Sequence, residues 1–99
     1  PSREEDSAVA VSQEKISWQQ KKEEQARKRK RENDLKKTEK RISELEERDG
    51  EIDQLLSQPE IATDPQQCAE LSQEQEGIKS ELEDLYEKWE SLAEASEDI

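Results

Sequence analysis

Two stretches of the chain decide its fold, residues 35–56 (LKKTEKRISELEERDGEIDQLL) and residues 68–92 (CAELSQEQEGIKSELEDLYEKWESL). In each stretch, a set of mainly apolar residues recurs at alternating intervals of three and four, which keeps the set in a narrow stripe on one helical face. The first stripe keeps its phase across Asp49-Gly50, a dipeptide that favours turns, so we expect the helix to continue there. The stripes consist of Leu35, Thr38, Ile42, Leu45, Asp49, Ile52 and Leu56, and of Cys68, Leu71, Gln75, Ile78, Leu82, Leu85, Trp89 and Leu92.

The segment between the stripes contains the signals that end one helix and begin the next. Proline disfavours helical torsions in the residue before it, so Ser57-Gln58-Pro59 ends the first helix. Asp64-Pro65 is typical of an N-cap followed by proline in the first turn, and Gln67 is placed to complete a capping box. Because the connection is short, the two helices fold back on each other and their stripes meet.

The sequence thus predicts an all-α chain, a two-helix antiparallel coiled-coil hairpin with a flexible N-terminal segment. Residues 1–14 are small, polar and acidic without a sustained period, which indicates a disordered linker. The hairpin is expected over residues 15–95, with helices at about 19–57 and 65–94, a loop at 58–64 and a disordered tail at 96–99.

Two registers of the hairpin are compatible with the stripes. The favoured one places Leu45 opposite Leu82, and the alternative, shifted by one heptad, places Ile52 opposite Cys68. The favoured register has more apolar matches, since it also pairs Leu56 with Leu71, Ile42 with Leu85 and Leu35 with Leu92, and sets Thr38 against Trp89.

Composition excludes most enzymatic and metal chemistry. The 99 residues are 44% charged and 27% hydrophobic, with no His, Phe or Met and a single Cys. Such a chain cannot fill a globular core, although it can fill a narrow seam between helices. Without His there is no Ser-His or Cys-His nucleophile, and we expect no catalytic residue, no metal site and no cofactor in this chain. The absence of an apolar run and of disulfide-forming cysteine pairs favours a cytoplasmic location.

The net charge of −12 is unevenly distributed. Residues 15–41 hold twelve Lys and Arg against five acidic residues, whereas residues 42–99 hold three against nineteen. Several cations along one rigid helix suit the phosphates of a nucleic acid, because counterion release supplies most nonspecific affinity. The competing interpretation is a solvated surface paired with the acidic second helix. The candidate binding residues are Lys21, Lys22, Arg27, Lys28, Arg29, Lys30, Arg31, Lys36, Lys37, Lys40 and Arg41, with Lys15 at their N-terminal side.

The aromatic residues and the cysteine are expected to pack rather than to bind. Trp89 occupies a stripe position, and Trp18 is expected to fold back over the open end of the hairpin, the alternative being that residues 15–20 extend the first helix past it. Stacking on bases is the other use of such side chains. Cys68 is expected to be a small buried apolar residue near the loop.

The order of short motifs resembles a known family. Lys15-Ile16-Ser17-Trp18 precedes a Lys/Glu/Gln/Arg-rich helix, Arg41 to Glu47 reads RISELEE, Pro59-Glu60-Ile61 lies in the loop, and the chain closes with YEKWESL at 86–92. This pattern, over about residues 15–94, is similar to the C-terminal coiled-coil domain of bacterial ABC-F ATPases, the Uup-like group. The chain departs from the family pattern at Trp18, where Tyr or Phe is usual, and at Gln58-Pro59, where Asp-Pro is usual.

The resemblance implies a larger parent protein with two ATP-binding cassettes upstream, so ATP would be a ligand of the parent and not of this chain. Members of the group lack transmembrane domains, and many act on the ribosome near the tRNA exit site. The C-terminal domain of Uup-like members is associated with nucleic-acid binding. The resemblance therefore implies a nonenzymatic module that binds rRNA, tRNA or DNA, and we expect it to be a monomer.

Two other functions are compatible with the sequence. A protein-interaction or spacer coiled coil would have the same heptads without binding nucleic acid. The tRNA-binding helical arm of a synthetase is also a basic hairpin, but it would carry cations on both helices, and here the second helix has only Lys79 and Lys88.

Overall fold

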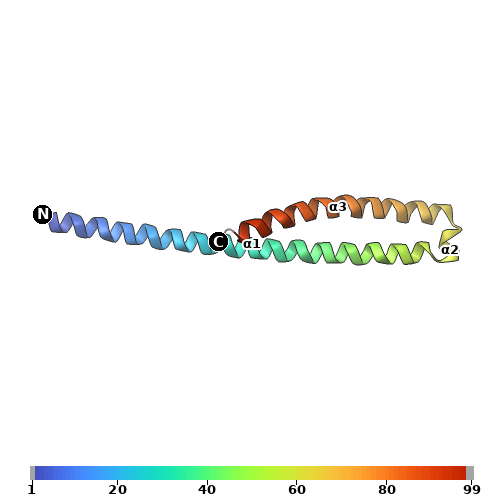
Figure 1. Ribbon diagram of the computed structural model, residues 1–99, viewed down its shortest axis with the longest axis horizontal. Helices are drawn as coiled ribbons and strands as arrows, with labels where there is room; N and C mark the ends of the chain where they lie inside the picture. Colours follow the sequence, from blue (N-terminus) through green and yellow to red (C-terminus); the bar gives the residue numbers. More distant parts are fainter. Residues whose placement is uncertain (1, 98–99) are drawn as a thin grey trace.

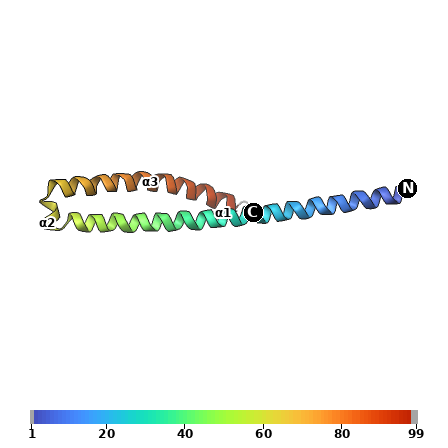
Figure 2. The same cartoon turned by 180° about the vertical axis from the view of Figure 1, so that it is seen from behind.

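A computed structural model describes the backbone of residues 2–97 and the side-chain surroundings of residues 13–96. Its helices are α1 (Ser2–Leu56), α2 (Pro59–Ala62) and α3 (Pro65–Glu97). Helices α1 and α3 lie side by side and antiparallel in both views (Figures 1 and 2). The molecule is a rod of 90 × 17 × 15 Å, which confirms the all-α antiparallel hairpin. None of the described helices is both long enough and apolar enough to cross a membrane.

Helix α1 extends well beyond the end of α3. At 1.5 Å per residue, the 55 residues of α1 span about 82 Å and the 33 residues of α3 about 50 Å. The N-terminal part of α1 therefore projects from the hairpin as a single helix, drawn in blue in Figure 1. The helix begins at Ser2 and not near residue 19 as expected, because residues 2–18 contain neither proline nor glycine to end it. The flexibility predicted for residues 1–14 stays a prediction, and the last two residues of the predicted tail lie outside the described part.

The seam between the helices is thin and follows the predicted stripes. Its buried hydrophobic residues are Ile42, Leu45, Ile52 and Ile78, and Ile52 alone has no exposed surface. Leu56, Leu71, Leu82 and Leu85 pack against this cluster and are partly buried. Thr38 is also buried, and its hydroxyl donates to the backbone carbonyl of Asp34 at 2.7 Å, which satisfies the polar group inside the seam.

The polar contacts along the two edges of the seam fix its register. On one edge, Arg41 donates to Glu81 and Arg48 donates to Glu74. The two arginines are seven residues apart on α1, and their partners are seven residues apart on α3 in the opposite chain direction. On the other edge, the hydroxyl of Tyr86 donates to Glu46. These contacts bracket the pairing of Leu45 with Leu82 and confirm the favoured register. The shifted register would bring Arg41 to Glu74 and leave Arg48 beside Gln67, which removes one of the two Arg–Glu pairs.

The tip of the hairpin differs from the loop predicted at residues 58–64, because residues 59–62 form the one-turn helix α2. The predicted N-cap of α3 is confirmed: the Asp64 carboxylate accepts the backbone N–H groups of Gln66 at 3.1 Å and Gln67 at 3.3 Å. The capping box takes a different form, since the Gln67 amide donates to the Asp64 carboxylate and not to its backbone. Cys68 is half-buried, and its thiol lies 3.1 Å from the carbonyl oxygen of Ile61.

Two expectations about the tryptophans are wrong. Trp18 does not fold back over the open end of the hairpin, because α1 is continuous through this residue and carries it away from α3 (Figure 1). Its side chain is 64% exposed, and Ile16 is 54% exposed. Trp89 is not enclosed in the seam: it is 36% exposed, and its indole N–H donates to Glu39 at 3.0 Å. The polar N–H at the edge of an indole usually has a hydrogen-bond partner, and here that partner is a carboxylate at the surface.

Candidate nucleic-acid interface

The candidate binding residues all lie on α1, and the end of α3 divides them into two groups. From residue 13 to residue 30 every described side chain is exposed, and Arg31 is the first that is half-buried. The first group, which we call the projecting arm, comprises residues 15–30. The second group comprises Arg31, Lys36, Lys37, Lys40 and Arg41, which lie where α1 runs beside α3.

The projecting arm is strongly cationic. It contains seven Lys and Arg and two Glu, which gives a net charge of +5 over residues 15–30. The described residues contain ion pairs only at Arg41 and Arg48, so none of the arm's cations is held by a carboxylate within the described structure. The arm therefore presents its charges to solvent along a straight helix.

One face of the arm carries no acidic residue. Lys15, Trp18, Lys22, Gln25 and Arg29 follow each other at intervals of three and four, which places them on a single helical face. The two glutamates of the arm are turned away from this face by their helical phase. A phosphate backbone that follows this face would meet cations without a neighbouring carboxylate.

The second group is in a different electrostatic setting, because α3 runs beside it with a strongly acidic sequence. Arg41 is committed to the hairpin: its guanidinium lies 2.9 Å from a Glu81 carboxylate oxygen and 3.8 Å from Glu44. Lys36, Lys37 and Lys40 are exposed but lie within the hairpin. The structure thus does not bring all the predicted site residues into one surface, and the arm is the part that stands apart from the acidic body.

Arg48 makes a bidentate polar contact between the helices. Its guanidinium donates two hydrogen bonds to the Glu74 carboxylate, from Nε at 2.5 Å and from Nη2 at 3.1 Å, and a third to Glu51 at 3.2 Å. The hydrogen bond from Arg48 lowers the pKa of Glu74 below the ordinary range of a glutamate. The sequence analysis did not single out this pair, although Arg48 lies directly beside the seam position of Asp49, where cross-helix ion pairs are expected.

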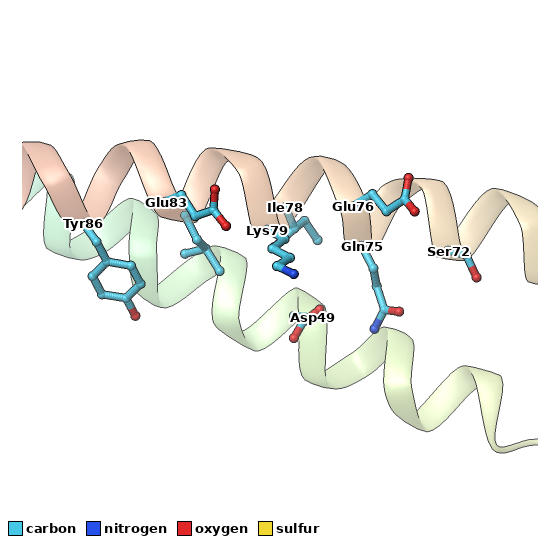
Figure 3. Close-up of a pocket in the computed structure, with 9 residues that line it drawn as sticks. Asp49, Ser72, Gln75, Glu76, Ile78, Lys79, Glu83 and Tyr86 are labelled. Carbon is cyan, nitrogen blue, oxygen red and sulfur yellow. The ribbon is translucent and has the colours of Figure 1, made fainter.

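A shallow trough of about 610 Å³ runs along the opposite edge of the seam. Figure 3 shows Gln75 and Tyr86 reaching from α3 toward α1 across it, with Asp49 on the α1 side. The Gln75 amide donates to Asp53 at 2.6 Å, and the hydrogen bond to Glu46 raises the pKa of Tyr86. Ile78 and Leu82 form the apolar lining of the trough. Two of the polar side chains that line the trough, Gln75 and Tyr86, are therefore already used to join the two helices.

No group of three or more potential metal ligands occurs in the described part of the chain. The carboxylates of the described residues are spread along two long helices, and the single cysteine lies at the tip.

One family of known proteins matches the part of the chain that contains the arm and the hairpin. The family model of the ABC transporter C-terminal domain matches residues 15–94, which include the projecting arm and all of the hairpin but the last residues of α3. No curated protein and no solved structure matches the chain. The matched residues cover most of the chain and coincide with the range of the motif resemblance. The chain therefore belongs to the ABC transporter C-terminal domain family, which is typical of ABC-F proteins such as Uup.

Proposed function

We propose that this domain is a nonenzymatic nucleic-acid-binding module and that the projecting arm is its binding surface. The observation that carries the proposal is the separation of charge: a +5 helix without ion-pair partners within the described structure extends from a hairpin that is strongly acidic. Phosphates attract the arm through counterion release and are repelled by the hairpin. The nucleic acid would therefore lie along the arm, with the tip of the hairpin pointing away.

Membership of the family bears on the larger protein in which this domain acts. We propose that the parent protein is an ABC-F ATPase whose ATP-binding cassettes are separate from this chain, and that it works in the cytoplasm on rRNA, tRNA or DNA. In this setting the domain supplies affinity and position, and ATP chemistry belongs to the cassettes.

The test compares two variants with equal net charge. In the arm variant, Lys21, Arg27, Lys28, Arg29 and Lys30 are replaced by Gln; in the hairpin variant, Lys36, Lys37, Lys40, Lys79 and Lys88 are replaced by Gln. Each variant loses five cations, and Gln preserves helix propensity. RNA and DNA are titrated with wild type and both variants at two salt concentrations.

The arm variant should bind much more weakly and lose about 0.7–0.9 log units of salt dependence for each phosphate contact removed. The hairpin variant should stay close to wild type. Equal losses in the two variants would mean that only total charge matters. No binding by wild type at low salt would discard the proposal and leave a protein-interaction or spacer coiled coil.

A further inference from the structure

Trp18 is the most exposed large apolar side chain among the described residues, at 64% of its surface. A tryptophan held in water on a lone helix loses most of the favourable burial of its ring. Trp18 does not contribute to the seam, because α3 ends before it reaches this part of α1 (Figure 1). The ring is therefore not packed against the hairpin.

The neighbours of Trp18 indicate what kind of ligand it suits. Trp18 lies on the acid-free face of the arm, between Lys15 and Lys22 and two turns from Gln25. The Lys22 ammonium lies over the ring, 5.2 Å from its centroid. An aromatic ring set among cations is the arrangement by which proteins hold single-stranded nucleic acids, since the cations follow the backbone and the ring stacks on a base.

We infer that Trp18 is a base-stacking residue and that the arm prefers unpaired over fully paired nucleic acid. This inference rests on the proposed function and adds a substrate class to it. In a duplex the base faces are covered by their neighbours, so Trp18 has nothing to stack on and only the cations contribute. In an unpaired segment, the ring gains a base while Lys15, Lys22 and Arg29 contact the flanking phosphates.

The test uses Trp18 as its own reporter. Trp89→Phe leaves Trp18 as the only tryptophan, and circular dichroism checks that the hairpin is kept. The Trp89→Phe protein is titrated with oligo(dT), oligo(rU) and a duplex, each of about 15 nucleotides or base pairs, while Trp18 emission is followed. The dT and rU arms distinguish DNA from RNA. Trp18→Ala and Ile16→Ala are then compared with wild type by the fluorescence anisotropy of the same oligonucleotides carrying a dye, because Trp18→Ala removes the tryptophan reporter. Ile16 is the control, since it is an exposed apolar residue on the opposite face of the same helix.

Both single strands should quench Trp18 emission strongly and the duplex should not. Trp18→Ala should weaken binding of the single strands by about tenfold and leave duplex binding unchanged, whereas Ile16→Ala should change neither. Saturable binding without quenching, or equal losses for strand and duplex, would overturn the stacking role while leaving the cationic arm in place. If no nucleic acid binds at all, the proposed function and the stacking role fail together.

Discussion

At the scale of single residues, the stability of the hairpin depends on very few side chains. Ile52 has no exposed surface, and the described part of the chain buries only three other hydrophobic residues. Ile52→Ala should therefore lower the free energy of unfolding by about 2–5 kcal/mol, and Ile52→Val by only about 0.5–1.5 kcal/mol. Thermal unfolding followed by circular dichroism measures both variants. An Ile52→Ala protein as stable as wild type would contradict the assignment of Ile52 to the centre of the seam.

The Arg48–Glu74 contact predicts a dependence of stability on pH. Because Arg48 lowers the pKa of Glu74 in the folded state, the contact stabilises the fold above the ordinary glutamate pKa. That stabilisation is lost as the pH falls through the lower, folded-state pKa. Glu74→Gln should thus melt below wild type at about pH 7, and the difference between the two proteins should shrink as the pH falls below the ordinary glutamate pKa of about 4.3. A constant difference across this range would mean that the charge of Glu74 is not the cause.

The pattern of residue types predicted which side chains form the seam, but not how exposed the tryptophan side chains are. The burial of Ile42, Leu45 and Ile52 could be predicted because residues that recur at alternating intervals of three and four lie on one face of a helix. Trp18 could not be placed, since an apolar residue beyond the last seam position has no period to join. Its exposure depends on whether α1 bends or continues, and that is a property of the helix and not of the residue.

At the scale of elements, α1 and α3 each contain one glycine within the helix. A methyl group at Gly50 or at Gly77 would meet no atom within 4 Å. Alanine has the higher helix propensity and loses less conformational freedom on folding. Gly50→Ala and Gly77→Ala should therefore each stabilise the hairpin by about 0.5–1 kcal/mol, measured by urea unfolding. Destabilisation by Gly50→Ala would indicate a turn or a bend at Asp49-Gly50.

The sequence predicted the elements more securely than their ends. Asp64-Pro65 identified the start of α3, because a capping carboxylate and a proline leave little choice there. The start of α1 was misplaced, since polarity and acidity indicate disorder while the absence of helix breakers permits a helix. The division of the basic residues into arm and hairpin could not be predicted from charge alone, because it depends on where α3 ends in the favoured register.

At the scale of the whole molecule, the short connection at the tip favours an intramolecular seam over pairing between chains. We predict a monomer of 11.5 kDa by sedimentation equilibrium at micromolar concentration. Its sedimentation velocity should be low for this mass, because the rod is 90 Å long and no more than 17 Å across. A stable dimer with parallel helices would contradict the closed hairpin.

The central claim is that nucleic acid binds the projecting arm and avoids the acidic hairpin. Amide chemical shifts of the isotope-labelled domain, followed by nuclear magnetic resonance during titration with a single-stranded oligonucleotide, test it residue by residue. We predict shift changes concentrated in residues 15–30, with residues 42–96 nearly unchanged. Shift changes centred on the hairpin or its tip, with the arm unaffected, would contradict the claim.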